Sequence, residues 1–282
     1  MPSSAERALG VAVAASPALP RAALRARAGA AALPAASVAV AIVMALAWQF
    51  LPPLLGVPKY ILPPLGDLVR EMARMWRQEN LLLHLVSTAS MAAAGFVLGS
   101  AFGAVCGYAL GLSALWERVL SPYILALQIA PKVAFAPLFI MWFGYNAMPK
   151  LLVTVLVVFF PILVNVLQAM KTADRDLVNL ARAFSMRRGQ IFAKVLFPAS
   201  LPNLMAGLRI GATLAVIGVT VGELVGGESG LGYLISYGEG QANTAMVFDA
   251  IALLTAIGIV LYGLVAVTEA RVLHYIPRPP MR

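Results

Sequence analysis

The sequence has few charged residues for its length. Of its 282 residues, 12% are Asp, Glu, Lys or Arg, whereas 61% are hydrophobic. A soluble domain usually contains about twice this charged fraction. Several apolar runs are also long enough to cross a bilayer, which takes roughly 18 residues or more. The composition therefore excludes an ordinary soluble domain and indicates an integral membrane protein.

Cysteine, histidine and catalytic motifs are scarce as well. The single cysteine, Cys106, excludes an intrachain disulfide. The two histidines, His84 and His274, are expected near opposite membrane faces, so with one cysteine no ordinary zinc site can be built. The dipeptide Gly-Lys does not occur, so the chain has no Walker-type phosphate loop. No serine-nucleophile, paired-carboxylate or dinucleotide motif is present either. These absences argue against an enzyme, and we expect no metal or cofactor in this chain.

Six apolar segments predict an all-α polytopic membrane protein. Each can cross a hydrocarbon core of roughly 30 Å. The spans are expected at about 36–55, 86–112, 119–143, 151–170, 201–225 and 245–268. This divides the chain into a basic tail (1–35), a first transmembrane helix (36–55), an outer loop with an amphipathic helix (56–85), a core transmembrane domain (86–270) that includes a cytoplasmic loop (171–199), and a C-terminal tail (271–282).

The net charge of +9 is better explained by topology than by nucleic-acid binding. If the N-terminus lies inside, most of the 21 Lys and Arg residues fall in the two tails and in the 171–199 loop. Because cytoplasmic loops are enriched in Lys and Arg, both termini are expected to be cytoplasmic. The N-terminal tail has no compact apolar region followed by a cleavage site, so we interpret it as a largely disordered tail and not as a signal peptide.

The outer loop is the exception to this charge rule, since it carries four basic residues. Its apolar residues recur with helical spacing, at Leu65, Leu68, Val69, Met72, Met75 and Trp76. We predict a short amphipathic helix here. It either lies along the outer membrane surface or packs against its own protein.

The second span contains five glycines at a strict spacing of four residues: Gly95, Gly99, Gly103, Gly107 and Gly111. Small residues at this spacing let another helix approach closely in a membrane. Internal packing against a neighbouring span is the favoured interpretation. A dimer face or a pore lining is the alternative.

The third span has a lysine, Lys132, between Pro131 and Pro137. Pro131 should kink the helix because proline removes a backbone donor. A lysine halfway along a span costs a few kcal/mol and marks a functional site by default. Lys132 either faces a water-filled path or snorkels to the inner surface. Further polar residues within spans are Asn165, Glu223 and Asp249.

The cytoplasmic loop carries six basic and two acidic residues between Lys171 and Lys194. Asp174 and Asp176 suit a helix N-terminus. Leu177, Leu180, Ala181 and Phe184 then share one helical face, and a second short helix should run from Met186 to Pro198. Two such helices form a compact knob. It either transmits force from a soluble motor to the spans or rests on anionic lipid headgroups.

This loop resembles the EAA loop of ABC importer permeases, whose pattern is E-A-A, three residues, G, nine residues, then I-x-L-P. The pattern falls on residues 179–181, on Ser185 and on residues 195–198, with its spacing intact. Asn179 replaces the family's Glu, and Ser185 replaces the glycine that normally makes the turn. Because serine in a left-handed conformation costs roughly 1 kcal/mol or more, either Ser185 bears that strain or the turn shifts toward Gly189.

The resemblance continues from about residue 65 to 268 through APKVAFAPLFIMWFG, LLVTVLVVFFPILVN and SGLGYLI. These stretches are similar to the branch that handles nitrate, alkanesulfonates, taurine and precursors of thiamine or riboflavin. The phrase IGATLAVIGVTVGELVGG most resembles the pyrimidine-precursor and riboflavin permeases. The resemblance implies a type I ABC importer permease in the bacterial inner membrane, acting as a homodimer with ATPase subunits, which bind ATP and Mg²⁺, and a solute-binding protein.

The resemblance also implies roles for particular residues. Contact with the ATPase is expected from Asp176, Asn179, Leu180, Ala181, Phe184, Ser185, Met186, Arg187 and Arg188. The candidates for the translocation path, which in the family lies between the two copies, are Gln128, Lys132, Asn165 and Glu223.

Two other classes of function remain open from the residues alone. A secondary transporter or channel would need no ATPase, but it would be expected to carry more ionisable residues within its spans. A membrane-anchored structural protein is disfavoured by kinked spans and a glycine ladder.

Overall fold

The computed structural model describes the chain from residue 19 to residue 274, and its side chains from residue 36. The described part is helical throughout, with no strand. It forms two compact units, 1–66 and 67–282. The first unit contains helix α2 (Leu19–Leu54), which begins within the segment predicted as a disordered tail. Residues 1–18 and 275–282, parts of the two predicted tails, lie outside the described residues.

The segment after α2 folds back on the end of that helix. The Trp48 indole donates a hydrogen bond to the Pro63 carbonyl (3.0 Å). The Gln49 side chain accepts one from the Gly66 amide (3.0 Å). These two bonds hold residues 55–66 against the helix.

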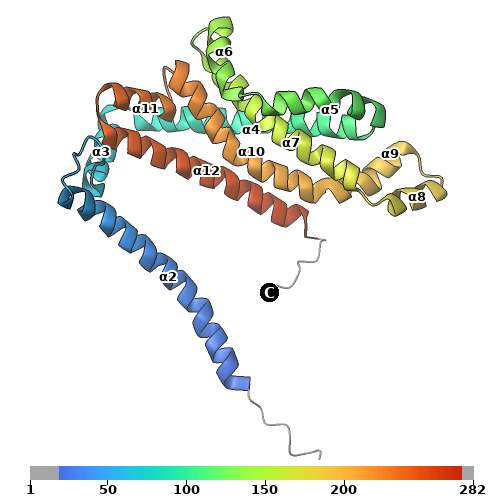
Figure 1. Ribbon diagram of the computed structural model, residues 1–282, viewed down its shortest axis with the longest axis horizontal. Coiled ribbons are helices and arrows are strands. Elements are labelled where there is room, and N and C mark those ends of the chain that lie inside the picture. Colours follow the sequence, from blue (N-terminus) through green and yellow to red (C-terminus); the bar gives the residue numbers. More distant parts are fainter. Residues whose placement is uncertain (1–18, 275–282) are drawn as a thin grey trace, which may run out of the picture. The chain divides into compact units, whose positions relative to one another are not determined.

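Helices in the second unit run from α3 to α12, with the bounds α3 Leu65–Gln78, α4 Leu81–Gly111, α5 Ala114–Ile129, η1 Lys132–Phe135, α6 Ala136–Phe143, α7 Ala147–Thr172, α8 Arg175–Ala183, α9 Arg188–Ile191, η2 Phe192–Leu196, α10 Phe197–Gly226, α11 Leu231–Gly240 and α12 Thr244–Val272. The long helices α4, α7, α10 and α12 lie side by side, with α8 and α9 at one end and α3 and α11 at the other (Figure 1). We call these the α8 end and the α11 end.

Five helices of the described chain are long and apolar enough to cross a membrane, at Ala36–Leu54, Leu81–Gly111, Ala147–Thr172, Arg188–Gly226 and Thr244–Val272. A sixth span results if α5 is counted together with η1 and α6, which bend by 81° at a short break. The prediction of about six spans agrees with this count. The third span differs from its prediction, since it is two helices and not one kinked helix.

The glycine ladder of α4 packs against α7. A Cβ added to Gly99 would lie 2.9 Å from the Val155 carbonyl oxygen, and one added to Gly107 would lie 2.8 Å from the Val166 Cβ. Gly218 and Gly222 of α10 approach α7 just as closely. These contacts put α7 between two helices whose backbones lie too near it for larger side chains. Half of the most apolar stretch of α7 is accordingly buried.

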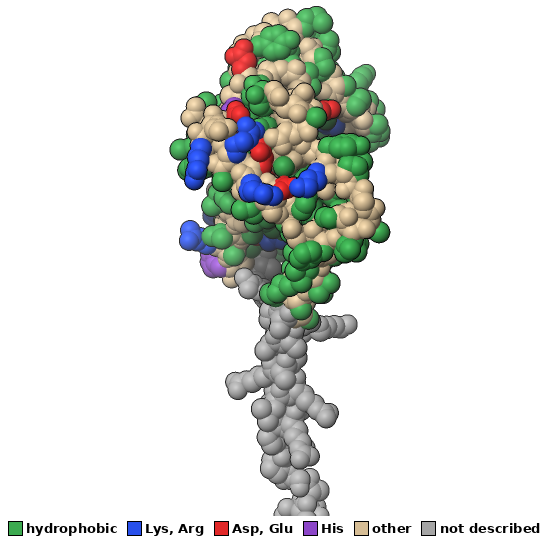
Figure 2. All heavy atoms as spheres, turned by 90° about the vertical axis from the view of Figure 1, so that its left-hand side faces the viewer, with side chains coloured by type: hydrophobic (Ala, Val, Ile, Leu, Met, Phe, Trp, Pro, Cys, Tyr) green, Lys and Arg blue, Asp and Glu red, His purple; other side chains and the backbone are tan. Residues whose placement is uncertain are grey.

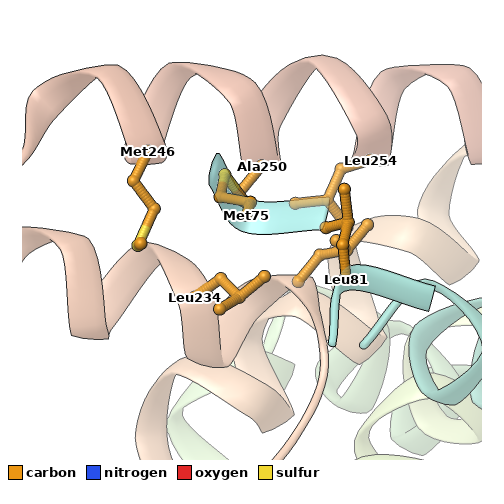
Figure 3. Packing of buried hydrophobic residues seen from close by; sticks show 7 residues of the cluster. Met75, Leu81, Leu234, Met246, Ala250 and Leu254 are labelled. Carbon is orange, nitrogen blue, oxygen red and sulfur yellow. The ribbon is translucent and has the colours of Figure 1, made fainter. Parts of the chain in front are cut away.

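At the α11 end, helix α3 packs against α11 and α12. Met75 is 0% exposed and lies in a hydrophobic cluster with Leu81, Leu234, Met246 and Ala250 (Figure 3). Val69 and Trp76, in contrast, remain 72% and 61% exposed. Of the two alternatives for this segment, the structure supports packing against its own protein.

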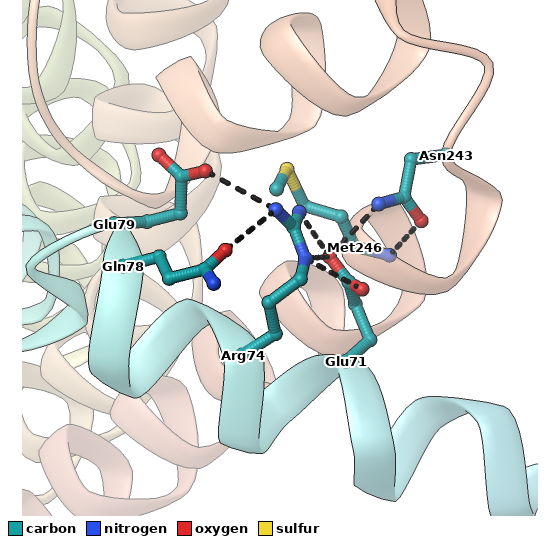
Figure 4. Close-up of polar contacts among 6 residues, drawn as sticks. All are labelled: Glu71, Arg74, Gln78, Glu79, Asn243 and Met246. Carbon is teal, nitrogen blue, oxygen red and sulfur yellow. Dashed lines mark hydrogen bonds and ion pairs between the residues drawn. The ribbon is translucent and has the colours of Figure 1, made fainter.

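Ion pairs within the polar side of α3 accompany a hydrogen bond that joins α3 to the start of α12. Arg74 pairs with Glu71 and Glu79, and Asn243 donates a hydrogen bond to Glu71 (2.8 Å; Figure 4). The hydrogen bonds from Arg74 lower the pKa of the Glu71 carboxyl, against the opposing effect of burial. Viewed from this end, charged side chains of both signs gather in the middle of the face (Figure 2).

Candidate functional site

The predicted knob is present at the α8 end of the bundle (Figure 1). Asp174 caps α8, since its side chain accepts a hydrogen bond from the Asp176 amide (2.8 Å). After α8 the chain turns at Ser185 and enters α9, where the Gln190 side chain accepts a bond from the Arg187 amide (2.9 Å). The N-termini of both short helices are thus capped by side chains that are close to them in sequence.

Ser185 bears the backbone strain that the sequence suggested. Its φ is 57°, in the left-handed region. The Met186 amide donates to the Ala181 carbonyl (3.1 Å) and the Ser185 amide to the Arg182 carbonyl (2.8 Å). These two bonds form a Schellman motif, in which glycine is the usual residue at the left-handed position. The turn has therefore kept its place at Ser185, although Gly189 was available nearby.

One face of the knob is apolar and uncovered. Leu177, Leu180 and Phe184 are 50%, 54% and 75% exposed. Ala181 and Ile191, by contrast, are buried, and α8 contacts α9 and η2. Asn179, Arg187 and Arg188 are exposed around the apolar face, and Met186 is half-buried. The knob thus presents a hydrophobic patch with a basic border outside the spans.

Helix α9 continues into α10 without a break in the helical backbone. The joint is a turn of π-helix, η2, in which the Phe197 amide reaches back to the Phe192 carbonyl. The prediction of a second helix ending at Pro198 is therefore wrong, because Pro198 stands in the first turn of α10, where a proline is tolerated. Turns of π-helix are often found at functional sites.

Tyr108 of α4 packs against this joint and is hydrogen-bonded to it. Its ring packs edge-on against Phe192, with centroids 5.4 Å apart, and against Phe197 at 5.6 Å. The Tyr108 hydroxyl lies 2.8 Å from the Ser200 hydroxyl, which itself donates to the Phe197 carbonyl. Since Ser200 has one hydroxyl hydrogen, Tyr108 is the donor in the first of these bonds. No pattern in the sequence indicates this contact.

The predicted path residues do not form one cluster. Lys132 stands at the break of the third span, where its ammonium donates to the Gln128 and Ala130 carbonyls and lies 5.0 Å from the centroid of the Phe160 ring. Gln128 is exposed beside it. Asn165 is half-buried in α7 and donates to the Pro161 carbonyl (2.8 Å). Glu223 is only 1% exposed, in the last turn of α10 at the α11 end.

Within the part of the chain that the structure describes, no group of three or more His, Cys, Asp or Glu side chains could hold a metal ion.

Comparison with known proteins places these features in a family. Residues 95–274 match the family model described as "Binding-protein-dependent transport system inner membrane component". Three similar proteins are a putative aliphatic sulfonates transport permease of Bacillus subtilis (32% identical, 81% of this chain and 83% of that protein), a formylaminopyrimidine transport permease of Halalkalibacterium halodurans (36%, 75% and 84%), and a riboflavin transport system permease of Chloroflexus aurantiacus (35%, 79% and 83%).

The fold is similar to a solved transporter as well. A chain of the MetNI methionine ABC transporter, in an inward-facing conformation, aligns with a TM-score of 0.60 at 21% sequence identity. The alignment covers 71% of this chain and 98% of that chain. At this identity the likeness supports the type I importer fold alone.

Proposed function

We propose that this chain, which belongs to the family of binding-protein-dependent transport inner membrane components, docks through its knob on an ATPase subunit that drives import. As a member of this family, the chain is a permease subunit of an ABC importer for small solutes. The observation that carries this proposal is the uncovered apolar face of Leu177, Leu180 and Phe184 outside the spans. Such a patch is stabilised by a protein groove that removes it from water. The strained turn at Ser185 fits the same role, since strain persists where the position of a segment matters.

The route from the knob into the membrane is short. Helix α9 is continuous with α10 through η2, and Tyr108 ties the joint to α4. A displacement of the knob would therefore move two spans together. We place the knob and both termini on the cytoplasmic side of a bacterial inner membrane, following the excess of Lys and Arg in these segments.

The broken span supports a dimer in which a second copy covers this region. Helix α5 has no buried residue in the single chain, and Gln128 and Ile129 before the break are exposed. Pro131 lacks an amide hydrogen, so the Leu127 carbonyl loses its helical donor. Non-helical backbone at membrane depth is tolerated only where protein covers it or water fills a cavity. We therefore propose that Gln128 and Lys132 line a path between two copies of the chain, with Asn165 and Glu223 behind it.

For the substrate we propose a small organic solute delivered by an external binding protein. A pyrimidine-type thiamine precursor or riboflavin is preferred, and alkanesulfonate, taurine or nitrate comes next. Lys132 favours an anionic or carbonyl-bearing group, because its ammonium is the cation at the break. Uptake assays with Lys132→Met test this role. A raised KM for uptake is expected, and unchanged uptake kinetics would contradict it.

The docking proposal is tested by Leu180→Glu combined with Phe184→Glu in the permease expressed together with its ATPase. Two buried charges in the groove should abolish both copurification and uptake. The matched control is Ala183→Glu combined with Gln190→Glu, which adds the same charge to exposed positions of the knob outside its apolar face. Normal copurification and uptake by the first variant would refute docking through this face.

A further inference from the structure

A second group of polar contacts lies at the α11 end, and of its side chains only Glu223 enters the function proposed above. It centres on the turn between α10 and α11. Four consecutive residues of this turn, 229 to 232, each have one backbone group bonded to a buried side chain. The four side chains come from three different spans, namely α4, α7 and α10.

The contacts run in order along the turn. Lys150 of α7 donates to the Ser229 carbonyl (2.8 Å). The Gly230 amide donates to the His84 Nδ1 of α4 (3.0 Å). The Leu231 amide donates to the Thr88 hydroxyl oxygen of α4 (2.7 Å), and the Gly232 amide to the Glu223 carboxylate of α10 (2.9 Å).

We call the side chains of His84, Thr88, Lys150 and Glu223 the clamp. All four are buried. Exposure is 8% for His84, 0% for Thr88, 6% for Lys150 and 1% for Glu223. The Thr88 hydroxyl donates to the Glu223 carboxylate, lying 2.9 Å from both of its oxygens. Thr88 and Glu223 therefore depend on each other, and His84 and Lys150 depend on the backbone of the turn, since a buried polar group left without a partner is costly.

Glycine is required where the turn passes over Glu223. Gly230 has a φ of +118°, and a Cβ there would collide with the Glu223 carboxylate. A Cβ on Gly232 would lie 2.7 Å from the Thr220 carbonyl oxygen. The turn thus fits the clamp in one position. The amides of residues 230–232 are also donors that the N-terminus of α11 would otherwise leave unpaired, so His84, Thr88 and Glu223 together satisfy the start of that helix.

We propose that Glu223, Thr88, His84 and Lys150 are positioning residues that bind α11 to the ends of α4, α7 and α10, so that these four helices move as one body during transport. This inference rests on the proposed function, because only in a transporter would α11 carry movement of the spans to the outer face. There α11 would meet the binding protein. Glu223, predicted as a path residue, would act here through the backbone of the turn.

The rigid-body claim is tested with a crosslink. The hydroxyl oxygens of Ser87 in α4 and Ser229 in the turn lie 3.3 Å apart. In a background with Cys106→Ser, the pair Ser87→Cys and Ser229→Cys can be oxidised or bridged by a short bifunctional reagent. Uptake in reconstituted vesicles should stay within twofold of the reduced protein. Loss of uptake on crosslinking that returns on reduction would overturn the proposal, because it would mean that α11 separates from α4.

The positioning role is tested with Thr88→Val, which keeps the shape of the side chain and removes its hydroxyl. We expect about a tenfold or greater loss of ATP hydrolysis stimulated by the binding protein, with basal hydrolysis and copurification of the ATPase unchanged. The Ser87–Ser229 crosslink should restore stimulation in this variant. Unaltered stimulation in both Thr88→Val and Glu223→Gln would refute the role, as would a loss that the crosslink does not rescue.

These readouts separate the two proposals. If the docking proposal fails, the variant with Leu180→Glu and Phe184→Glu copurifies with the ATPase and imports solute normally. If only the clamp fails, copurification and uptake by the unmodified permease remain, and the crosslink or the variants give the contrary result.

Discussion

Replacing Ser185 with glycine should stabilise the knob. Ser185 is held at a φ of 57° by the two hydrogen bonds of its Schellman motif. A left-handed conformation costs a residue with a Cβ about 1–2 kcal/mol. Glycine removes that cost but makes the unfolded chain freer, which offsets roughly 0.4–1 kcal/mol. The net gain for Ser185→Gly is therefore about 0.5–1 kcal/mol.

Hydrogen exchange of the α8 amides in lipid nanodiscs measures this gain, because it reports local opening of a helix end. A stabilisation of this size should slow exchange of residues 175–183 about two- to fivefold. Ser185→Ala is the control, since it removes the hydroxyl and leaves a Cβ in the left-handed region. It should give no increase in protection. Equal protection in both variants, or none with glycine, would show that the turn is not strained at this residue.

Three further predictions concern other contacts. Gly103→Ala should destabilise the permease by about 1–3 kcal/mol in detergent unfolding, because the added Cβ would lie 2.6 Å from the Phe159 carbonyl oxygen, whereas Gly263→Ala, with open space around it, should not. Tyr108→Ala should lower the amount of solute imported per ATP, and Tyr108→Phe should retain most of it, since the ring contacts survive. The Glu71 carboxylate, which bonds Arg74 within α3 and Asn243 at the start of α12, stabilises α3 above the ordinary carboxyl pKa of 4.5, and this contribution is lost as the pH falls through the lowered pKa. The protection factors of the α3 amides, which correct for the intrinsic effect of pH on exchange, should therefore fall below about pH 4.5, and this dependence should vanish in Glu71→Gln.

Short-range patterns in the sequence predicted the local features of the fold. The spacing of the α4 glycines indicated close helix packing, and the partner proved to be α7. The capping aspartates and the apolar repeat placed α8 within one residue of its bounds. Such features depend on residues a few positions apart, so helical periodicity is enough to reveal them.

Features that depend on distant partners could not be predicted in this way. The Glu223 carboxylate is bonded to Thr88, which lies 135 residues earlier in the chain. Read alone, an acid near the end of a span suggests an exposed vestibule, and only the fold reveals its burial. The 81° bend at Pro131 exceeds an ordinary proline kink. Lys132 helps to stabilise it, because its ammonium donates to the Gln128 and Ala130 carbonyls at the break.

Helices α10 and α5 differ in how firmly they are packed and joined to their neighbours, and this difference bears on mechanism. Helix α10 is continuous with α9 at one end, packs through glycines against α7 in the middle, and is bonded to the α11 turn through Glu223 at the other. Helix α5, in contrast, has no buried residue in the single chain and joins α6 through a break. Packed interfaces move as units because close-packed interiors resist deformation. A displacement of the knob would therefore reach the α11 end through α10 with little loss, and the change of shape would fall at the break beside Lys132, where we propose that the solute path lies.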